Sequence, residues 1–501
     1  MGTKNLIFKN KIKFILNDKI TAPVIFYNNE KKSFSSLFEI LPKNLRLNIS
    51  KIVEKEKLNK GEVKVFHTFD NEIKNIILIG ISKLNIRDFH YFSRLPIKIA
   101  LKEKIEKIDI KPDDLYIFDT KDQLLNYFEF IKYFVVNIIM ADFDFSQYYK
   151  KEPEGGWFHI KQINFLIDKN LDEVKRKINE GILISEEVNT ARVISNMPGG
   201  DMTPEIFVDI IKQHTKDFEG KVKIFNKKQL EKMGMNSILA VGKGSIHPPF
   251  LVILEYLPNK KEKPLVYIGK GITFDTGGLH LKPSEGMKDM NLDMSGGASV
   301  FTAVIAISKN KIKKNVVALI PIAENFPGAD AYRPGDLIKS YSGKVIEIGS
   351  PDAEGRVILA DAIEYSKKYN PKFILTLATL TGAAMVALGD KVSAILSDLD
   401  ENEIKKIIDL SYMCGDFVWP LPLWEEYRND IKPQFGDIWN IGKSRYGGIM
   451  HGAVFLWEFA KPFKLVHIDM APKMVANNEE NLSSGSVGFG VKLLYELSKN
   501  F

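Results

Sequence analysis

The second half of the chain alternates regularly between apolar runs and longer amphipathic segments. Runs typical of strands that are buried on both faces lie at 264–270, 315–322, 373–380 and 465–471. Segments with helical spacing lie between them, at 298–310, 358–370 and 452–462. This order predicts an α/β fold with a mostly parallel or mixed central sheet flanked by helices. Ligands of such sheets bind beyond the carboxyl ends of the strands.

The first part of the chain has a different pattern, with short β-like runs at 22–27, 61–68 and 76–81. A long amphipathic run follows at 171–196, which holds no proline and a single glycine. It ends at "MPGGDMTP", where Thr203-Pro204 is a typical helix start. We therefore expect three parts, a smaller N-terminal α/β domain, a linker helix and a larger C-terminal catalytic α/β domain, with the bounds 1–165, 166–195 and 196–501.

Length and composition agree with this division. A chain of 501 residues is too long for one ordinary core, and its 45% apolar and 27% charged content is usual for a soluble globular protein. Lysines interrupt the apolar runs near the N-terminus, and we expect no signal peptide and no membrane span. The single cysteine, Cys414, excludes an internal disulfide framework, which favours a reducing cytoplasm.

The charge of the chain is unevenly distributed, with an excess of positive charge near the N-terminus. The chain carries a net charge of +7, and residues 1–60 alone hold 13 Lys/Arg against 5 Asp/Glu. A basic segment can bind nucleic acid, so a DNA-binding or scaffolding protein is the alternative to an enzyme. The ordinary interpretation, a lysine-rich face in contact with water, is favoured, and we expect neither nucleic acid nor membrane as a partner.

The stretch "GSPDAEGRVILADAI" (349–363) places Asp352, Glu354 and Arg356 within five positions. Because Pro351 disfavours helix before it and Gly355 permits unusual backbone angles, we expect an extended or looped segment that points both carboxylates the same way. Acidic loops before helices commonly serve only the helix dipole. This stretch alone therefore does not establish a site.

A second group of charged residues follows the run at 264–270. Lys270 lies at the end of the predicted strand, Asp275 is expected in a glycine-rich loop, and Lys282 and Asp293 come before the next predicted helix. With the segment at 352–356, four carboxylates and three cations gather at one edge of the predicted sheet. Four clustered carboxylates cannot all stay ionised without positive charge, and two divalent metal ions would supply it.

The kinds of residue present narrow the choice of metal. Carboxylate oxygens suit magnesium, manganese or zinc. The chain has no HExxH motif and no cysteine cluster, which excludes a thermolysin-like or zinc-finger site. The sequence also excludes a phosphate-binding P-loop. The segment "GDIWNIGKS" has five residues between its glycines, whereas the motif requires four.

Four segments closely resemble the signatures of the leucyl aminopeptidase (cytosol aminopeptidase) family of metallopeptidases. They are "GKGITFDTGGLHLKP", "MKDMNLDMSGGA", "DAEGRVILADA" and "ATLTGAA", and their order and spacing match. The resemblance extends from about residue 196 to the C-terminus, including "NMPGGDMTP", "HIDMA" and "SSGSVGFGVKLL". It implies a metal-dependent enzyme that hydrolyses the N-terminal peptide bond of peptides. It also implies a homohexamer, a dimer of trimers.

The resemblance implies a role for each charged residue. Asp275 and Glu354 would bridge two metal ions per subunit, Asp293 and Lys270 would complete one site, and Asp352 would serve the other. The ions would be manganese or zinc, with magnesium and cobalt as alternatives. A metal-bridging water would be the nucleophile. From the bare sequence, an ion pair between Lys270 and Asp275 would be preferred over a metal ligand.

The other side chains complete the implied mechanism. Lys282 would stabilise the carbonyl oxygen as an electrophile, and Arg356 would hold bicarbonate as general base, with help from the backbone of Leu380. An apolar pocket would favour leucine-like or other apolar first residues, and its lining would be Met290, Thr379, Gly382, Ala471 and Met474. The less favoured alternative is that Met290 and Met474 are simply core residues.

The chain departs from the family pattern in two places. Ser350-Pro351 stands where the family usually has Asn-Thr, and the segment after Gly448 reads "IMHGAVFL" where "ITAA.FL" is more usual. Neither change affects a proposed ligand or catalytic side chain, so we expect activity to survive. His280 and His451 occupy positions where histidine is not expected, and we assign them no catalytic role.

Overall fold

The computed structural model describes residues 7–16, 19–116, 124–146, 148, 158–167, 169–259 and 261–501. The chain divides into two compact units. The larger unit contains Glu187–Ala476 and Ser484–Phe501, and the smaller unit contains Lys9–Glu186 and Asn477–Ser483. Helix α5 (Leu171–Asn196) contains the boundary between them. Its bounds are those of the long amphipathic run.

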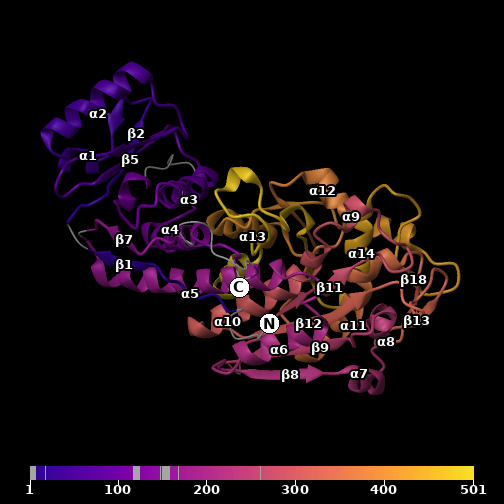
Figure 1. The fold of residues 1–501 in the computed structure, drawn as a ribbon. Helices are drawn as coiled ribbons and strands as arrows, with labels where there is room; N and C mark the ends of the chain where they lie inside the picture. Colours follow the sequence, from indigo (N-terminus) through magenta and orange to yellow (C-terminus); the bar gives the residue numbers. More distant parts are fainter. Residues whose placement is uncertain are drawn as a thin grey trace. The chain divides into compact units, whose positions relative to one another are not determined.

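A mixed sheet forms the centre of the larger unit (Figure 1). Among the described residues it has nine strands, in the order β17-β16-β19-β15-β10-β12-β9-β8, with β11 paired to β12. The neighbours from β19 to β12 are parallel, and β11 is also parallel to β12. The pairs β16/β19, β12/β9 and β8/β9 are antiparallel. The bounds are β8 Lys221–Phe225, β9 Phe250–Tyr256, β10 Leu265–Gly269, β11 Gly271–Asp275, β12 Val316–Asn325, β15 Ile374–Ala378, β16 Ser393–Ser397, β17 Val418–Pro420 and β19 Leu465–Asp469.

Helices cover both faces of this sheet. Val266 and Ile268 of β10 belong to a core that also includes residues of α8 (Asn236–Val241), α11 (Glu354–Ser366) and α14 (Gly448–Ala460). Tyr267, which points to the opposite face, donates a hydrogen bond to the Leu494 carbonyl of α15 (Val491–Asn500). Helix α10 (Ser295–Lys309) packs against α15 and the central strands. The predicted α/β class, with helices around a mixed sheet, is confirmed.

Glycines let α10 begin close against the strands. A Cβ atom at Gly296 would lie 2.2 Å from the Leu377 carbonyl oxygen, and one at Gly269 would lie 2.4 Å from the Gly296 carbonyl oxygen. Side chains at these positions would push the helix away from β10 and β15. The glycines of "MSGGA" therefore hold the residues just before α10 near the carboxyl ends of the strands.

Contrary to the expectation of no membrane span, one segment has the length and composition of such a span. It is Met290–Lys309, which includes α10, and 89% of its 18-residue window is buried inside the protein. The core helix of a globular unit has the same composition, because every face of it contacts other elements.

The larger unit also contains further helices and a separate three-stranded sheet, β13-β14-β18. They are α6 (Pro204–His214), α7 (Lys227–Met233), α9 (Ser284–Met287), α12 (Gly382–Leu388), α13 (Glu401–Cys414), β13 (Leu337–Lys339), β14 (Val345–Glu347) and β18 (Ile438–Trp439). Short 3-10 turns lie beside the site, η4 (Met290–Met294), η5 (Pro351–Ala353) and η8 (Ala471–Lys473). The predicted helix start at Thr203-Pro204 is confirmed, since the Thr203 hydroxyl accepts a hydrogen bond from the Ile206 amide.

The smaller unit is also α/β. Its described part has a four-stranded sheet, β3-β2-β5-β4, and a three-stranded sheet, β1-β7-β6. Strands β2 and β5 are parallel neighbours. The strands are β1 (Lys13–Leu16), β2 (Val24–Asn28), β3 (Ser33–Phe34), β4 (Val63–His67), β5 (Asn75–Ile81), β6 (Lys107–Ile110) and β7 (Gln162–Phe165). The helices are α1 (Leu37–Ile40), α2 (Lys43–Glu56), α3 (Ile86–Lys102) and α4 (Tyr127–Ala141).

Candidate metal centre

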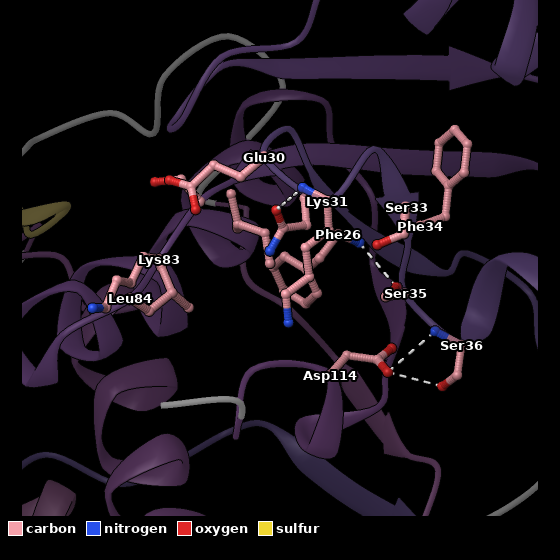
Figure 2. A pocket seen from close by; sticks show the side chains of 13 residues that line it. Phe26, Glu30, Lys31, Ser33, Phe34, Ser35, Ser36, Lys83, Leu84 and Asp114 are labelled. Atoms are coloured by element: carbon pink, nitrogen blue, oxygen red, sulfur yellow. Dashed lines mark hydrogen bonds between the residues drawn. The ribbon is translucent and has the colours of Figure 1, made fainter. Parts of the chain in front are cut away.

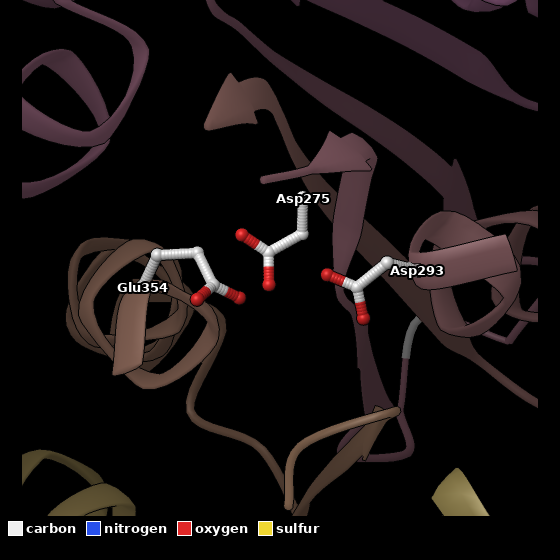
Figure 3. A group of neighbouring side chains, drawn as sticks. All are labelled: Asp275, Asp293 and Glu354. Carbon is white, nitrogen blue, oxygen red and sulfur yellow. The ribbon is translucent and has the colours of Figure 1, made fainter. Parts of the chain in front are cut away.

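Three carboxylates converge at the carboxyl edge of the central sheet. Asp275, Asp293 and Glu354 each contribute an oxygen atom, and these atoms lie within 4.8 Å of one another. Figure 3 shows the side chains facing a common space from a strand end, the segment before a helix and the start of α11. All three are about 2% exposed. Asp275 is the last residue of β11 rather than part of a loop, because the chain resumes strand pairing with β12 directly after Lys270.

Two lysines supply positive charge to this cluster. Lys270 Nζ lies 2.8 Å from Asp293 Oδ2 and 2.7 Å from Glu354 Oε1. Lys282 Nζ lies 2.9 Å from Asp275 Oδ2 and 2.5 Å from Asp352 Oδ1. The ion pair of Asp275 is therefore made with Lys282, and Lys270 pairs with the other two acids. The edge of the sheet brings together every charged residue expected at positions 270–293.

Burial shifts the pKa values of the charged groups in this cluster. Burial and the neighbouring charge of Asp275 raise the pKa of Glu354, although Lys270 opposes the shift. Burial likewise raises the pKa of Asp293. Burial alone would lower the pKa of Lys270, but the charges of Asp293, Glu354 and Asp275 outweigh it and raise the pKa. The site thus favours more positive charge than its lysines provide.

The cluster also contains oxygen atoms suited to a metal ion. Glu354 Oε2 is buried and accepts no hydrogen bond from any residue that the structure describes, and Asp293 Oδ2 has only its ion pair with Lys270 among these residues. Buried polar atoms are rarely left in this state without a missing partner such as water or an ion. Oxygen atoms of ionised carboxylates are the ligands that hard and borderline divalent ions prefer. The residues present therefore fit a divalent metal ion.

Asp352 lies outside the three-carboxylate group. Its side chain is 37% exposed and pairs with Lys282. The segment before it is the 3-10 turn η5, and α11 begins at Glu354, so the expected extended or looped geometry is wrong at these residues. The Ser350 hydroxyl accepts a hydrogen bond from the Asp352 amide at 3.2 Å, which closes the turn. Burial raises the pKa of Asp352, and Lys282 opposes this shift.

Arg356 lies in the first turn of α11, two residues after Glu354, and is almost fully buried. Its Nη1 donates a hydrogen bond to the Asn440 carbonyl at 2.9 Å. Within the described part of the chain its Nε has no acceptor. Burial lowers the pKa of Arg356 to about 10. A buried guanidinium with an unused N–H is a potential site for a small anion.

Apart from Met290, the residues expected to contact substrate follow two adjacent strands, β15 and β19. Thr379 comes directly after β15, and its hydroxyl donates a hydrogen bond to Asp293 Oδ1 at 2.6 Å. Gly382 begins α12, which packs against η8, the turn that contains Ala471. Met474 is buried directly after η8, and Met290 is half-buried at the start of η4. The amide of Leu380 donates to Asp469 Oδ1 at 3.1 Å.

Asn325, the last residue of β12, is a further residue of the site and was not predicted from the sequence. Its Nδ2 donates to Asp275 Oδ1 at 2.8 Å and to the Pro351 carbonyl at 3.1 Å. The Tyr332 hydroxyl donates to the same carbonyl at 2.7 Å. The sequence does contain a signal for Asn325, because it is a polar residue at the end of a buried apolar strand. Lys270 was predicted from the same kind of position, at the end of β10.

Comparisons with known proteins agree with this geometry. Residues 189–495 match the family model described as "Cytosol aminopeptidase family, catalytic domain". A probable cytosol aminopeptidase of Persephonella marina is 34% identical over 489 residues, which cover 95% of this chain and 96% of the relative. One of Clostridium perfringens is 34% identical and covers 91% and 92%. The solved structure of the bottromycin maturation enzyme BotP, in complex with Mn, has the same fold, with a TM-score of 0.81 at 23% identity over 96% of this chain and 99% of that one.

The fold and the matched family together define a metallo-aminopeptidase, a hydrolase that acts on peptides. The chain belongs to the cytosol aminopeptidase family, as the resemblance of its motifs predicted. The matched region contains every residue that was expected to bind metal or to take part in the reaction.

Proposed function

We propose that the protein is a dinuclear metal-dependent aminopeptidase that removes leucine-like or other apolar residues from the N-termini of peptides. The observation that carries this proposal is the group of three buried carboxylates that share one space, with two lysines between them, in a chain of this family. The proposal includes a homohexamer, a dimer of trimers, in the cytoplasm. It also keeps the division into an N-terminal domain (1–165), a linker helix (166–195) and a catalytic domain (196–501).

The proposed metal ligands are Lys270, Asp275, Asp293, Asp352 and Glu354. Asp275 and Glu354 would each be shared by two ions, because the charges of both residues act on Lys270 and also on Lys282. Asp293 and Lys270 would bind the more enclosed ion, since both are buried. Asp352 would bind the more exchangeable ion, in keeping with its exposed side chain. To act as a ligand, Lys270 must lose its proton, which the positive charge of a nearby dication favours.

Bound divalent ions, manganese or zinc, would polarise the scissile carbonyl and lower the pKa of a water molecule. Lys282 is held beside this space by Asp275 and Asp352, and its ammonium group would stabilise negative charge on the carbonyl oxygen. Arg356 would hold bicarbonate as general base through its unused Nε. The backbone amide of Leu380 would help to position that anion by exchanging its hydrogen bond to Asp469 Oδ1 for one to the anion. The anion would accept the proton that the water loses.

The first residue of the substrate would enter an apolar pocket lined by Met290, Thr379, Gly382, Ala471 and Met474. Thr379 connects this pocket to the metal centre, because its hydroxyl is bonded to Asp293. Methionine side chains adapt to apolar groups of different shape, which supports a preference for leucine-like residues without strict selection.

The test is hydrolysis of leucine p-nitroanilide by the purified full-length protein with added Mn²⁺ or Zn²⁺. We expect activity that a chelator abolishes and that Glu354→Gln reduces by about a thousandfold or more, because a shared ligand loses its charge. Glu364→Gln is the matched control, since Glu364 lies on the same helix and pairs only with Lys367 among the described residues. Metal analysis should find two ions per chain. Full activity of Glu354→Gln, or activity after complete metal removal, would contradict the proposal.

A further inference from the structure

A pocket in the smaller unit lies at the carboxyl ends of two parallel strands. It has a volume of about 570 Å³, and it is bordered by Asn28, the last residue of β2, and Ile81, the last residue of β5. This is the edge at which open α/β sheets bind ligands, and the volume is in the range of small-molecule sites. All of its lining residues belong to the smaller unit, so it is separate from the metal centre.

A buried carboxylate with an unused oxygen lies in the wall of this pocket. Asp114 is 8% exposed, and its Oδ1 accepts hydrogen bonds from the Ser36 amide at 3.2 Å and the Ser36 hydroxyl at 2.8 Å (Figure 2). Its Oδ2 has no hydrogen-bond partner among the residues that the structure describes. A buried carboxylate oxygen without a donor is costly, and a ligand that carries a cationic N–H group would relieve that cost.

The rest of the lining has complementary chemistry. Lys31 and Lys83 line the pocket and bring positive charge to it, and the exposed Glu30 adds a second negative charge beside that of Asp114. The apolar residues of the lining are Phe26, Phe34, Ile81 and Leu84, and of these Phe34 is only half-buried and offers apolar surface to a ligand. A ligand that satisfies all three features has a cationic donor, an anionic group and an apolar part. The smallest common molecules with these three parts are α-amino acids with apolar side chains.

We propose that this pocket binds a free apolar α-amino acid, with its ammonium group on Asp114 and its carboxylate toward Lys31 and Lys83. Binding at the pocket does not depend on the metal centre. Only the biological role of this binding rests on the proposed function, because an apolar amino acid is the product that the aminopeptidase would release. The smaller unit would then sense the product of the larger one.

The test is isothermal titration of the full-length, metal-loaded protein with L-leucine. We expect two classes of site, one of which is the metal centre. Asp114→Asn should weaken the other class by about tenfold or more, because a charge-assisted hydrogen bond is lost. It should leave hydrolysis of leucine p-nitroanilide in the absence of added leucine unchanged. Asp113→Asn is the matched control, since Asp113 is an exposed neighbour that does not line the pocket.

Two analogues of leucine separate the proposed contacts. Isoamylamine lacks the carboxylate and should still require Asp114, whereas 4-methylpentanoate lacks the ammonium group and should bind equally weakly to wild type and Asp114→Asn. Lys31→Ala should weaken leucine about two- to fivefold and leave isoamylamine unchanged. Lys32→Ala is its control, because Lys32 is also exposed but does not line the pocket. Both lysine variants change exposed side chains, so they remain informative if Asp114→Asn does not fold.

The outcomes distinguish this proposal from the proposed function. Leucine binding that depends on Asp114 in a protein without peptidase activity would support the pocket and refute the catalytic assignment. Peptidase activity in a protein whose only leucine site is the metal centre would support the catalytic assignment and refute the pocket proposal. The pocket proposal is overturned if Asp114→Asn and Lys31→Ala both bind leucine as the wild type does.

Discussion

Gly355 leaves room for the Lys270 side chain inside the metal centre. It is the second residue of α11, directly after Glu354. A Cβ atom at this position would lie 2.7 Å from Lys270 Cε, 2.8 Å from Nζ and 2.9 Å from Cδ. Real Cβ contacts are essentially never this short, so Gly355→Ala must displace something. The group that moves is the end of the lysine, because it is flexible and α11 is fixed by its packing.

The free energies involved predict a folded protein with a damaged site. Replacing glycine by alanine in a helix stabilises it by about 0.5–1 kcal/mol. The crowding that it causes costs about 1–3 kcal/mol. The net loss of stability is thus at most about 2.5 kcal/mol, which lowers the melting temperature by a few degrees in a protein of this size. By contrast, a displacement of roughly 1 Å at a reacting group reduces turnover about a hundredfold.

The measurement compares kcat/KM for leucine p-nitroanilide, bound metal and melting temperature in Gly355→Ala and wild type. We expect at least about a hundredfold loss of kcat/KM with a melting temperature near that of wild type. Gly286→Ala is the control, because the nearest atom to its added Cβ is 3.6 Å away, at Pro283. If Gly355→Ala keeps full activity, Lys270 does not need the position that the structure gives it, and its role as a ligand is refuted.

Three further predictions concern the surroundings of the site and the smaller unit. Asn325→Leu removes the donor to Asp275, so we expect weaker metal binding and a loss of stability of about 2–4 kcal/mol in denaturant titrations. Added Mn²⁺ should raise the melting temperature of wild type but raise that of Asp293→Asn much less. The hydrogen bond from His159 to Asp142 raises the pKa of His159 in the folded protein. The stability that this hydrogen bond contributes is therefore complete below about pH 6.5, the pKa of an unfolded histidine, and is lost as the pH rises through the higher folded pKa. Compared with His159→Gln, wild type should therefore melt higher at about pH 5.5 and equally at about pH 9; an equal gap at both values would contradict this assignment.

The strands of the larger unit could be predicted because they are buried on both faces. Nearly continuous apolar runs give strands β10, β12, β15 and β19 within a few residues of the predicted bounds. Strand β11 escaped prediction because it follows β10 after a single residue, and its glycines and polar residues suggest a loop. The missed strand matters for the site, since its pairing with β12 places Asp275 beside Asn325.

The residues of the site could be predicted more fully than their contacts. Order and spacing of the motifs identify the charged residues, but the choice of ion-pair partner depends on distances between loops that are far apart in sequence. Lys270 pairs with residues 23 and 84 positions away, and not with the nearer Asp275. Likewise, no local pattern indicates that Tyr332 supports the turn before Asp352 through a backbone carbonyl.

The departure at Ser350-Pro351 is compatible with the local geometry of the site. Ser350 caps the turn η5, a role for which serine and asparagine are about equally suited, and proline is favoured at the next position. Asn325 and Tyr332 hold the turn by the carbonyl of Pro351, a group that does not depend on the side chain. The two unusual residues at the rim also meet each other, since His280 Nδ1 lies 3.0 Å from the Ser350 hydroxyl oxygen. The change at position 350 therefore alters the exposed surface near Asp352, whereas the hydrogen bonds from Asn325 and Tyr332 that hold the turn before Glu354 stay in place. It should affect the choice of substrate more than the catalytic chemistry.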